Sequence, residues 1–210
     1  MDFPRRGLYA ITDASLIAPD TLVDAVAKAI QGGAAVIQYR DKGTDHTRRL
    51  AEAWALHALC AANAVCFVIN DDVDLALEVG ANGVHIGAED ADLRTARRRL
   101  GPDAIVGVSC YNRLDLALQA QEAGADYVAF GRFFPSKTKP GNISASADLL
   151  RAACQHLPIP IVAIGGVTPE NGAALLDAGA DLLAVVHGIF GDCDPEAAAR
   201  RYQSLFKNIY

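Results

Sequence analysis

Short apolar runs alternate along this chain with longer segments that are apolar on one side only. The short runs are largely continuous, without the in-and-out alternation of a sheet that faces water. This pattern is typical of parallel strands covered on both faces. We expect eight such strands, over Gly7–Thr12, Ala35–Tyr39, Cys66–Asn70, Gly83–Ile86, Ala104–Ser109, Tyr127–Gly131, Ile161–Ile164 and Leu182–Val186.

The longer segments have the periodicity of amphipathic helices. Leu22, Val26 and Ile30 recur every four residues and so share one helix face. Thr168-Pro169-Glu170 is a helix-start signal, with proline in the first turn. A glycine-alanine pair precedes every second strand and favours a sharp turn out of a helix. These pairs are Gly33-Ala34, Gly80-Ala81, Gly124-Ala125 and Gly179-Ala180.

Eight strands and eight helices would divide the 210 residues into units of about 26 residues each, with little room for insertions. The sequence therefore predicts the α/β fold class and a single-domain (β/α)8 TIM barrel over residues 1–210. An open doubly wound sheet is the alternative. Against it, the glycine-rich phosphate loop of that fold is missing after the first strand, where Ile11-Thr12-Asp13 stands instead.

Composition limits the kinds of partner and the compartment that we expect for this protein. The net charge is −6 and no basic stripe offsets it, so nucleic acid is not expected. No apolar run approaches the roughly 18 residues of a membrane span, and no signal-peptide core follows Met1. Five cysteines without a CxxC pair suit small buried side chains in a reducing compartment. We expect a cytoplasmic protein, and the sequence leaves self-association into a homo-oligomer open.

Cations gather at the predicted strand ends, where barrels of this type build their sites. Arg40 and Lys42 follow the second strand two residues apart, so both side chains can point to the same side. Lys139 follows the sixth strand in a loop with Ser136 and Thr138. Basic groups together in an acidic protein indicate a phosphorylated or pyrophosphorylated small-molecule ligand. Lys137, taken alone, is better explained as a solvated surface lysine.

Glycine and aspartate residues also follow the predicted strands at positions that suit ligand binding. Gly165-Gly166 and His187-Gly188 follow the last two strands, where backbone N–H groups often bind phosphate. Asp71 and Asp90 follow adjacent strands, and their carboxylates suit either one Mg2+ ion or general acid–base catalysis. Zinc with His85 is disfavoured, because no second histidine precedes the eighth strand on the inner side.

Some of these acids have a structural alternative. Asp72, Asp41 and Asp90 each stand where a helix is expected to begin, and an aspartate there caps the helix.

The strand-end motifs resemble those of the thiamin phosphate synthase family over nearly the whole chain. The motifs are Gln38-Tyr39-Arg40-Asp41-Lys42, Asn70-Asp71-Asp72, Gly83-Val84-His85-Ile86-Gly87, Ser136-Lys137-Thr138-Lys139 and Gly165-Gly166-Val167. The resemblance implies the joining of 4-amino-5-hydroxymethyl-2-methylpyrimidine diphosphate to a thiazole phosphate. Thiamin phosphate forms and pyrophosphate leaves, together with CO2 if the thiazole is carboxylated.

The same resemblance implies a role for each site residue. Asp71 and Asp90 match ligands of one Mg2+ per active site. Arg40, Lys42, Ser109 and Lys139 match catalytic positions. The residues that match the pyrimidine diphosphate site are Gln38, Tyr39, Arg40, Asp41, Lys42, Asn70, Ser109 and Lys139. Those that match the thiazole phosphate site are Ser136, Lys137, Thr138, Gly166, Val186 and His187.

The chain departs from the family pattern at a few of these positions. Ser136 stands where threonine is usual, and His187 where serine is more common. Arg132 lies in a stretch that differs from the family, and the sequence leaves open whether it contacts phosphate or solvent.

Three other functions fit the same barrel. A phosphosugar isomerase or lyase is suggested by the phosphate loops alone, but a Schiff-base lyase needs a lysine on a barrel strand, and none stands in the eight predicted strands. A thiazole tautomerase-like isomerase needs neither diphosphate nor magnesium, and the retention of Arg40, Lys42 and Asp71 argues against it. A non-catalytic sensor of phosphorylated ligands would be expected to have lost a cation or a carboxylate, and none is missing.

Overall fold

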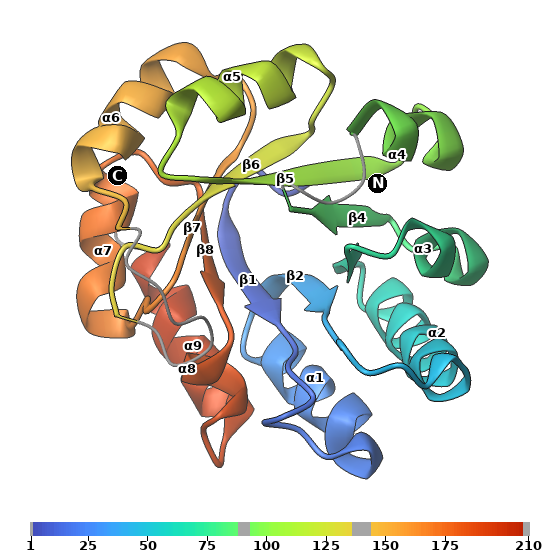
Figure 1. Ribbon diagram of the computed structural model, residues 1–210. Coiled ribbons are helices and arrows are strands. Elements are labelled where there is room, and N and C mark those ends of the chain that lie inside the picture. Colours follow the sequence, from blue (N-terminus) through green and yellow to red (C-terminus); the bar gives the residue numbers. More distant parts are fainter. Residues whose placement is uncertain (1, 88–92, 136–143, 208–210) are drawn as a thin grey trace.

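Eight parallel strands close into a barrel in the computed structural model of the chain, which describes residues 2–87, 93–135 and 144–207 (Figure 1). Each strand pairs with its neighbours in sequence, and the last strand returns to the first, where Leu8 pairs with Leu183. The strands are β1 (Gly7–Ile11), β2 (Ala34–Tyr39), β3 (Cys66–Asn70), β4 (Gly83–Ile86), β5 (Ile105–Tyr111), β6 (Tyr127–Phe130), β7 (Ile161–Ile164) and β8 (Leu182–Val185).

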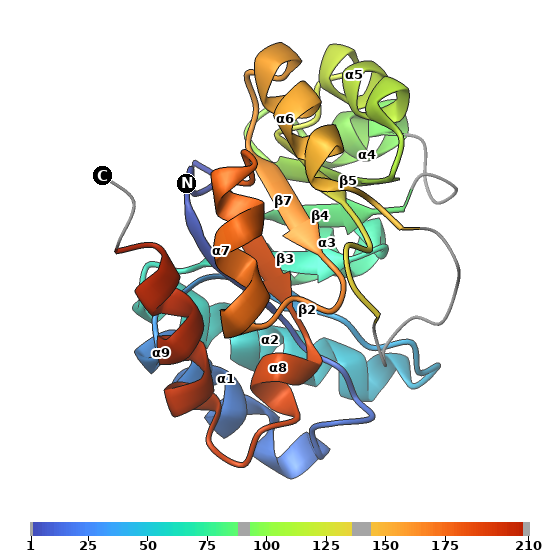
Figure 2. The ribbon, with the colours of Figure 1, turned by 90° about the vertical axis from the view of Figure 1, so that its left-hand side faces the viewer.

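Helices connect the strands and surround the barrel (Figure 2). They are the 3-10 turn η1 (Pro19–Thr21), α1 (Leu22–Gln31), α2 (His46–Ala62), α3 (Val73–Val79), α4 (Leu93–Leu100), α5 (Leu114–Glu122), α6 (Ala147–His156), α7 (Pro169–Asp177), α8 (His187–Phe190) and α9 (Pro195–Leu205). The predicted (β/α)8 TIM barrel is confirmed. That residues 1–210 form one domain in their entirety stays a prediction.

The four glycine-alanine turns behave as the sequence predicts. Gly33, Gly80, Gly124 and Gly179 all have positive φ, from 68° at Gly80 to 110° at Gly179. Side-chain-bearing residues rarely adopt this conformation, so glycine permits each helix to turn directly into the next strand.

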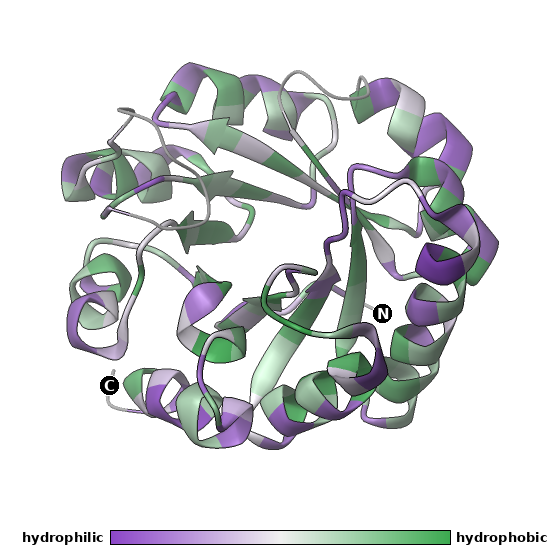
Figure 3. Cartoon of the chain, turned by 60° about the horizontal axis from the view of Figure 1, so that its bottom comes forward, coloured by the Kyte–Doolittle hydropathy of each residue, from purple (hydrophilic) through white to green (hydrophobic). Residues whose placement is uncertain are grey.

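The hydrophobic core has two layers. The larger layer lies between strands and helices and includes Leu8, Phe67 and Leu150. The smaller layer fills the barrel interior and includes Tyr9, Val68 and Tyr127. Figure 3 shows hydrophobic colouring on the strands and hydrophilic colouring spread over the helices. No helix within residues 2–87, 93–135 and 144–207 combines the length and the apolar character needed to cross a bilayer.

The structure corrects the sequence prediction at several element ends. β1, β6 and β8 end one residue earlier than predicted, β2 begins one residue earlier, and β5 runs from Ile105 to Tyr111. Among the described residues the α-helices number nine rather than eight, because the four-residue α8 precedes α9. Of the five cysteines, Cys154 and Cys193 are exposed rather than buried.

Candidate active site

A cavity of about 600 Å3 opens at the carboxyl end of the barrel. Residues from all eight strands or the loops that follow them line it, as expected for this fold. Nine residues predicted from the sequence are among them: Gln38, Arg40, Lys42, Asn70, Asp71, Ser109, Gly166, Val186 and His187. These side chains and glycines, far apart in sequence, therefore share one cavity.

Two cations from the end of β2 border one side of this cavity. Arg40 forms an ion pair with Asp13, in which Nη1 lies 3.0 Å from the carboxylate Oδ2. The Arg40 backbone N–H donates to Thr12 Oγ1 at 2.9 Å. Burial opposes ionisation of Asp13, but hydrogen bonds from Ser15 and the charge of Arg40 outweigh it and lower the pKa of Asp13. The end of β1 thus orients the guanidinium.

Gln38 has an unsatisfied donor beside the cavity. The residue is only 2% exposed, and its amide Nε2 has no hydrogen-bond partner among the described residues. A buried amide left unpaired is costly, on the order of 1–3 kcal/mol. An acceptor atom on a bound ligand would remove that cost, which makes Gln38 a candidate ligand contact.

Asp71 occupies a strained position after β3. Its φ is +62°, a left-handed conformation that aspartate tolerates better than most residues. Its backbone N–H donates to the His85 carbonyl at 2.8 Å, and its Oδ2 accepts from Asn70 Nδ2 at 2.6 Å. The adjacent Asp72 has a different task, since its side chain accepts from Leu75 N and caps α3, as the sequence predicted.

The opposite side of the cavity is formed by glycine backbone. Gly165 and Gly166 have φ of +99° and +65°, and a Cβ on Gly166 would lie 2.4 Å from the Pro135 carbonyl oxygen. Both glycines lie in the loop before α7, which begins at Pro169, at the helix-start signal that the sequence predicted. Arg132 also lines the cavity, which supports a site residue rather than a surface one.

A buried tyrosine contacts the backbone next to these glycines. Tyr202 on α9 is 1% exposed, and its hydroxyl donates to the Val167 carbonyl at 3.1 Å. A Cβ on Gly188 would lie 2.1 Å from the same hydroxyl oxygen, so Gly188 is needed for this contact. Sequence reasoning missed Tyr202, which lies well outside the strand-end motifs.

Two predicted site residues do not line the cavity. Tyr39 is buried, and its hydroxyl donates to Glu52 Oε2 at 2.6 Å. Burial and the neighbouring Glu52 raise the pKa of Tyr39. Asp41 accepts from Gly43 N at 2.6 Å and pairs with Arg48, and it does not cap α2, which Asp45 caps instead. Both residues attach the β2 end to α2, and Asp41 also lines a second, adjoining cavity together with Lys42, Asn70 and Asp71.

Five further predicted residues lie outside the described part of the chain. They are Asp90, Ser136, Lys137, Thr138 and Lys139.

Comparisons with known proteins agree with this architecture. The profile of the family described as "Thiamine monophosphate synthase" matches residues 8–189. The thiamine-phosphate synthase of Nitrosococcus oceani is 53% identical over 201 residues, covering 96% of this chain and 93% of that protein. That of Thioalkalivibrio sulfidiphilus is 51% identical and covers 96% of both chains. A solved thiamine phosphate pyrophosphorylase from Pyrococcus furiosus superposes with a TM-score of 0.87 at 33% identity, covering 97% of this chain and 96% of its own.

Proposed function

Because this chain belongs to the thiamine monophosphate synthase family and has thiamine-phosphate synthase activity, we propose that the cavity at the carboxyl end of the barrel is its active site. The enzyme is a transferase of the EC 2.5.1.3 type that acts on phosphorylated small molecules. We expect it to work in the cytoplasm. Whether copies of the chain associate stays open.

The observation that carries this proposal is the two-sided character of the cavity. One side presents the charges of Arg40 and Lys42, and the other presents the glycine backbone of Gly165 and Gly166. Apolar side chains such as Ile11 and Val162 line the space as well. Two anionic groups bound on opposite sides, with aromatic rings between them, match the two substrates of the reaction.

The cationic side suits the pyrimidine diphosphate. Arg40 and Lys42 neutralise the diphosphate, while Gln38 and Asn70 offer amide groups for the ring and the phosphate oxygens. Ser109 reaches the same space from β5. We add Lys139 on sequence grounds alone. Tyr39 and Asp41 pair with side chains of α2, and a ligand contact by either one stays a prediction from the sequence.

A single Mg2+ ion fits the acids at this side. Mg2+ is usually bound by one or two carboxylates plus substrate phosphates, with water completing the shell. Asp71 borders the cavity, and within the described ranges no cluster of three or more His, Cys, Asp or Glu side chains could hold a metal unaided. Such a site suits an ion that shares its ligands with the diphosphate. We propose Asp71 and Asp90 as the protein ligands.

The glycine side suits the thiazole phosphate. Without side chains at Gly165 and Gly166, a phosphate can approach the backbone closely. The loop around Val186 and His187 completes this wall of the cavity. Ser136, Lys137 and Thr138 join this group as proposals from the sequence. At His187, where serine is more common in the family, we propose that the backbone N–H faces the phosphate.

The chain's contribution to the chemistry is mainly electrostatic. The amino group of the pyrimidine donates electrons toward the methylene carbon, so its C–O bond breaks as negative charge grows on the departing pyrophosphate. Arg40 and Lys42 stabilise that charge, and a bound Mg2+ would supply further charge neutralisation. The thiazole nitrogen then attacks the carbon, and the apolar wall keeps water from competing. No protein nucleophile is required.

Release of pyrophosphate tests this proposal. Purified protein incubated with both substrates and Mg2+ is expected to release one pyrophosphate per thiamin phosphate formed. Neither substrate alone should release it at a comparable rate. Conversion of the thiazole without consumption of the diphosphate would instead support the isomerase alternative.

Replacement of Asp71 by asparagine is expected to raise the Mg2+ concentration for half-maximal activity about tenfold or more. The asparagine keeps the size of the side chain and tolerates the left-handed backbone, but it removes the charge that an ion requires. A magnesium titration of the steady-state rate measures the effect. An unchanged midpoint would exclude Asp71 as a ligand.

Asp72→Asn is the matched control for this titration. It changes the adjacent carboxylate in the same way, and asparagine still caps α3. We expect the wild-type magnesium midpoint in this variant.

Replacement of Gly166 by alanine is expected to raise KM for the thiazole phosphate about tenfold. The new Cβ would clash with the Pro135 carbonyl oxygen and displace the loop that faces the phosphate. KM for the pyrimidine diphosphate should change much less, because that substrate lies on the other side. Gly101→Ala, also at positive φ but with no atom within 4 Å of its Cβ, separates backbone strain from the local clash. Equal KM effects on both substrates would contradict the assignment.

A further inference from the structure

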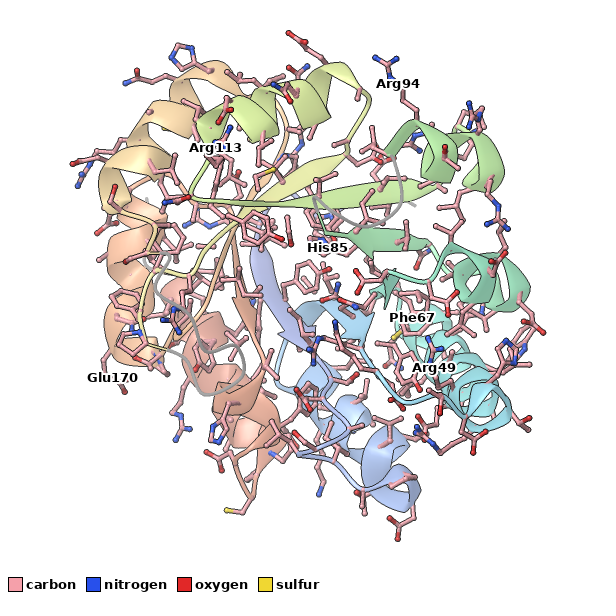
Figure 4. All side chains as sticks on the ribbon, viewed as in Figure 1. Arg49, Phe67, His85, Arg94, Arg113 and Glu170 are labelled. Atoms are coloured by element: carbon pink, nitrogen blue, oxygen red, sulfur yellow. The ribbon has the colours of Figure 1, made fainter. Side chains whose placement is uncertain are left out.

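A path of hydrogen bonds joins four side chains from four strands, and three of them, Tyr9, His85 and Ser109, line the cavity. The Tyr9 and Tyr127 hydroxyls lie 2.8 Å apart, and the Tyr127 hydroxyl is 2.9 Å from His85 Nδ1. His85 Nε2 in turn is 2.8 Å from Ser109 Oγ. Figure 4 shows His85 inside the ring of strands. The proposed function uses Ser109 alone of these four.

The side chains of this hydrogen-bond path are tightly packed inside the barrel. Phe3 stacks on the Tyr127 ring at a centroid distance of 4.0 Å, and His85 stacks on the same ring at 5.5 Å. A Cβ at Gly107 would lie 1.9 Å from Tyr127 Cζ, so glycine leaves the space that the ring occupies. Tyr127 is therefore held in one position from several sides.

From this arrangement we propose that Tyr127 is a positioning residue: through His85 it obliges the Ser109 hydroxyl to donate its hydrogen into the cavity. The proposal rests on the proposed function in one respect only, namely that Ser109 faces the pyrimidine diphosphate. It adds a direction to each hydrogen bond, and hence a tautomer for His85.

The direction follows from counting hydrogens. Tyr9 and Tyr127 are 2% and 0% exposed, and burial raises the pKa of both, so each remains a neutral hydroxyl with one hydrogen. Among the described residues, the Tyr9 hydroxyl has no hydrogen-bond partner other than Tyr127. If Tyr9 donates to Tyr127, the Tyr127 hydrogen goes to His85 Nδ1. His85 then carries its hydrogen on Nε2 and donates to Ser109.

The opposite directions leave a hydroxyl hydrogen without an acceptor. If Ser109 donated to His85 and His85 to Tyr127, then Tyr127 would donate to Tyr9, and the Tyr9 hydrogen would have no partner on the described chain. If Tyr127 accepted from both neighbours, its own hydrogen would be stranded. An unpaired buried donor costs roughly 1–3 kcal/mol, enough to select one direction.

The consequence concerns the substrate. Ser109 Oγ accepts from His85, so its own hydrogen is directed to an acceptor atom of the pyrimidine diphosphate. A donor fixed before binding needs no reorientation when negative charge grows on the leaving group. Ser109 is therefore the hydrogen-bond donor to the substrate, and Tyr127 sets the direction of its hydrogen through His85.

Nitrogen-15 spectra of the unliganded protein test the tautomer directly. Long-range proton–nitrogen correlation spectra at a pH of about 8 distinguish a ring protonated on Nε2 from one protonated on Nδ1 or on both. The chain has five histidines, so the His85 signals are identified by their loss in His85→Gln. We expect the neutral Nε2–H tautomer. A ring protonated on Nδ1, or a charged ring, would overturn the proposal whatever the activity of the protein.

Two phenylalanine variants test the link to Tyr127. In Tyr127→Phe, His85 loses the donor to Nδ1, and we expect a mixture of tautomers and a kcat about tenfold lower. That is less than the roughly 10²–10³ for outright loss of such a donor. KM for the pyrimidine diphosphate should stay within about threefold. Tyr9→Phe removes the same group one step farther away, and Tyr127 should still donate to His85, so this control should keep the wild-type tautomer.

The outcomes separate the proposal from the assigned function. A Tyr127→Phe protein with the wild-type tautomer and full kcat contradicts the positioning role. If that variant does not fold, the wild-type spectrum still decides the direction. The expected tautomer in a protein without synthase activity would instead contradict the function.

Discussion

Replacement of Arg40 by glutamine is expected to lower kcat by about 10²–10³, equivalent to roughly 2.7–4 kcal/mol of lost transition-state stabilisation. The guanidinium borders the cavity and is held by Asp13 at 3.0 Å, so it is oriented before the substrate arrives. Its charge matters most when the C–O bond breaks and charge grows on the pyrophosphate. KM for the diphosphate should rise less than kcat falls. Steady-state kinetics with each substrate varied measures both.

Arg113→Gln is the matched control for Arg40. Arg113 makes a similar ion pair, with Asp115, but its side chain is 58% exposed at the outer surface of the barrel (Figure 4). Exposed pairs contribute little, about 0–1 kcal/mol, so we expect near wild-type kinetics and stability. An Arg40→Gln enzyme with normal kcat would remove Arg40 from the catalytic group.

Replacement of Lys139 by alanine is expected to have an effect of similar size, a decrease of about 10²–10³ in kcat with little change in KM for the thiazole phosphate. Lys139 follows Thr138 directly in the sequence, so we propose that one loop contacts both substrates. We propose that Thr138 faces the thiazole phosphate and Lys139 the departing pyrophosphate. Steady-state kinetics on the purified variant measures both constants.

Lys137→Ala is the control for this experiment. From the sequence we expect a solvated lysine at this position, so its variant should behave almost normally. A Lys137→Ala enzyme that fails as badly as Lys139→Ala would contradict the assignment of Lys139 to the departing pyrophosphate.

The barrel could be predicted because its signals are local and repeated. Continuous apolar runs fixed the eight strands to within two residues at either end. The end of β5 was missed because it depends on Tyr111, whose φ of +52° and irregular pairing have no sequence signature. α8 was missed for a related reason: four residues are too few to show a helical period.

Strand periodicity separates the predicted site residues at the end of β2 into two sets. Gln38, Arg40 and Lys42 alternate along the end of β2 and line the cavity, whereas Tyr39 and Asp41 lie between them and face α2. Grouping all five as one motif ignored the two-residue period of side chains, which would have separated them.

Contacts across the barrel could not be predicted in the same way. The path from Tyr9 through Tyr127 and His85 joins β1, β6 and β4, and depends on the register between strands. A single sequence does not contain that register. The position of Tyr202 against Gly188 depends likewise on how α9 packs against α8.

A crystal structure with thiamin phosphate, pyrophosphate and Mg2+ bound tests the two-sided active site most directly. We predict pyrophosphate oxygens within hydrogen-bonding distance of Arg40 and Lys42, a magnesium ion on Asp71, and the product phosphate against the backbone at Gly166. The product phosphate bound at Arg40 and Lys42, with pyrophosphate at the glycine side, would contradict the account.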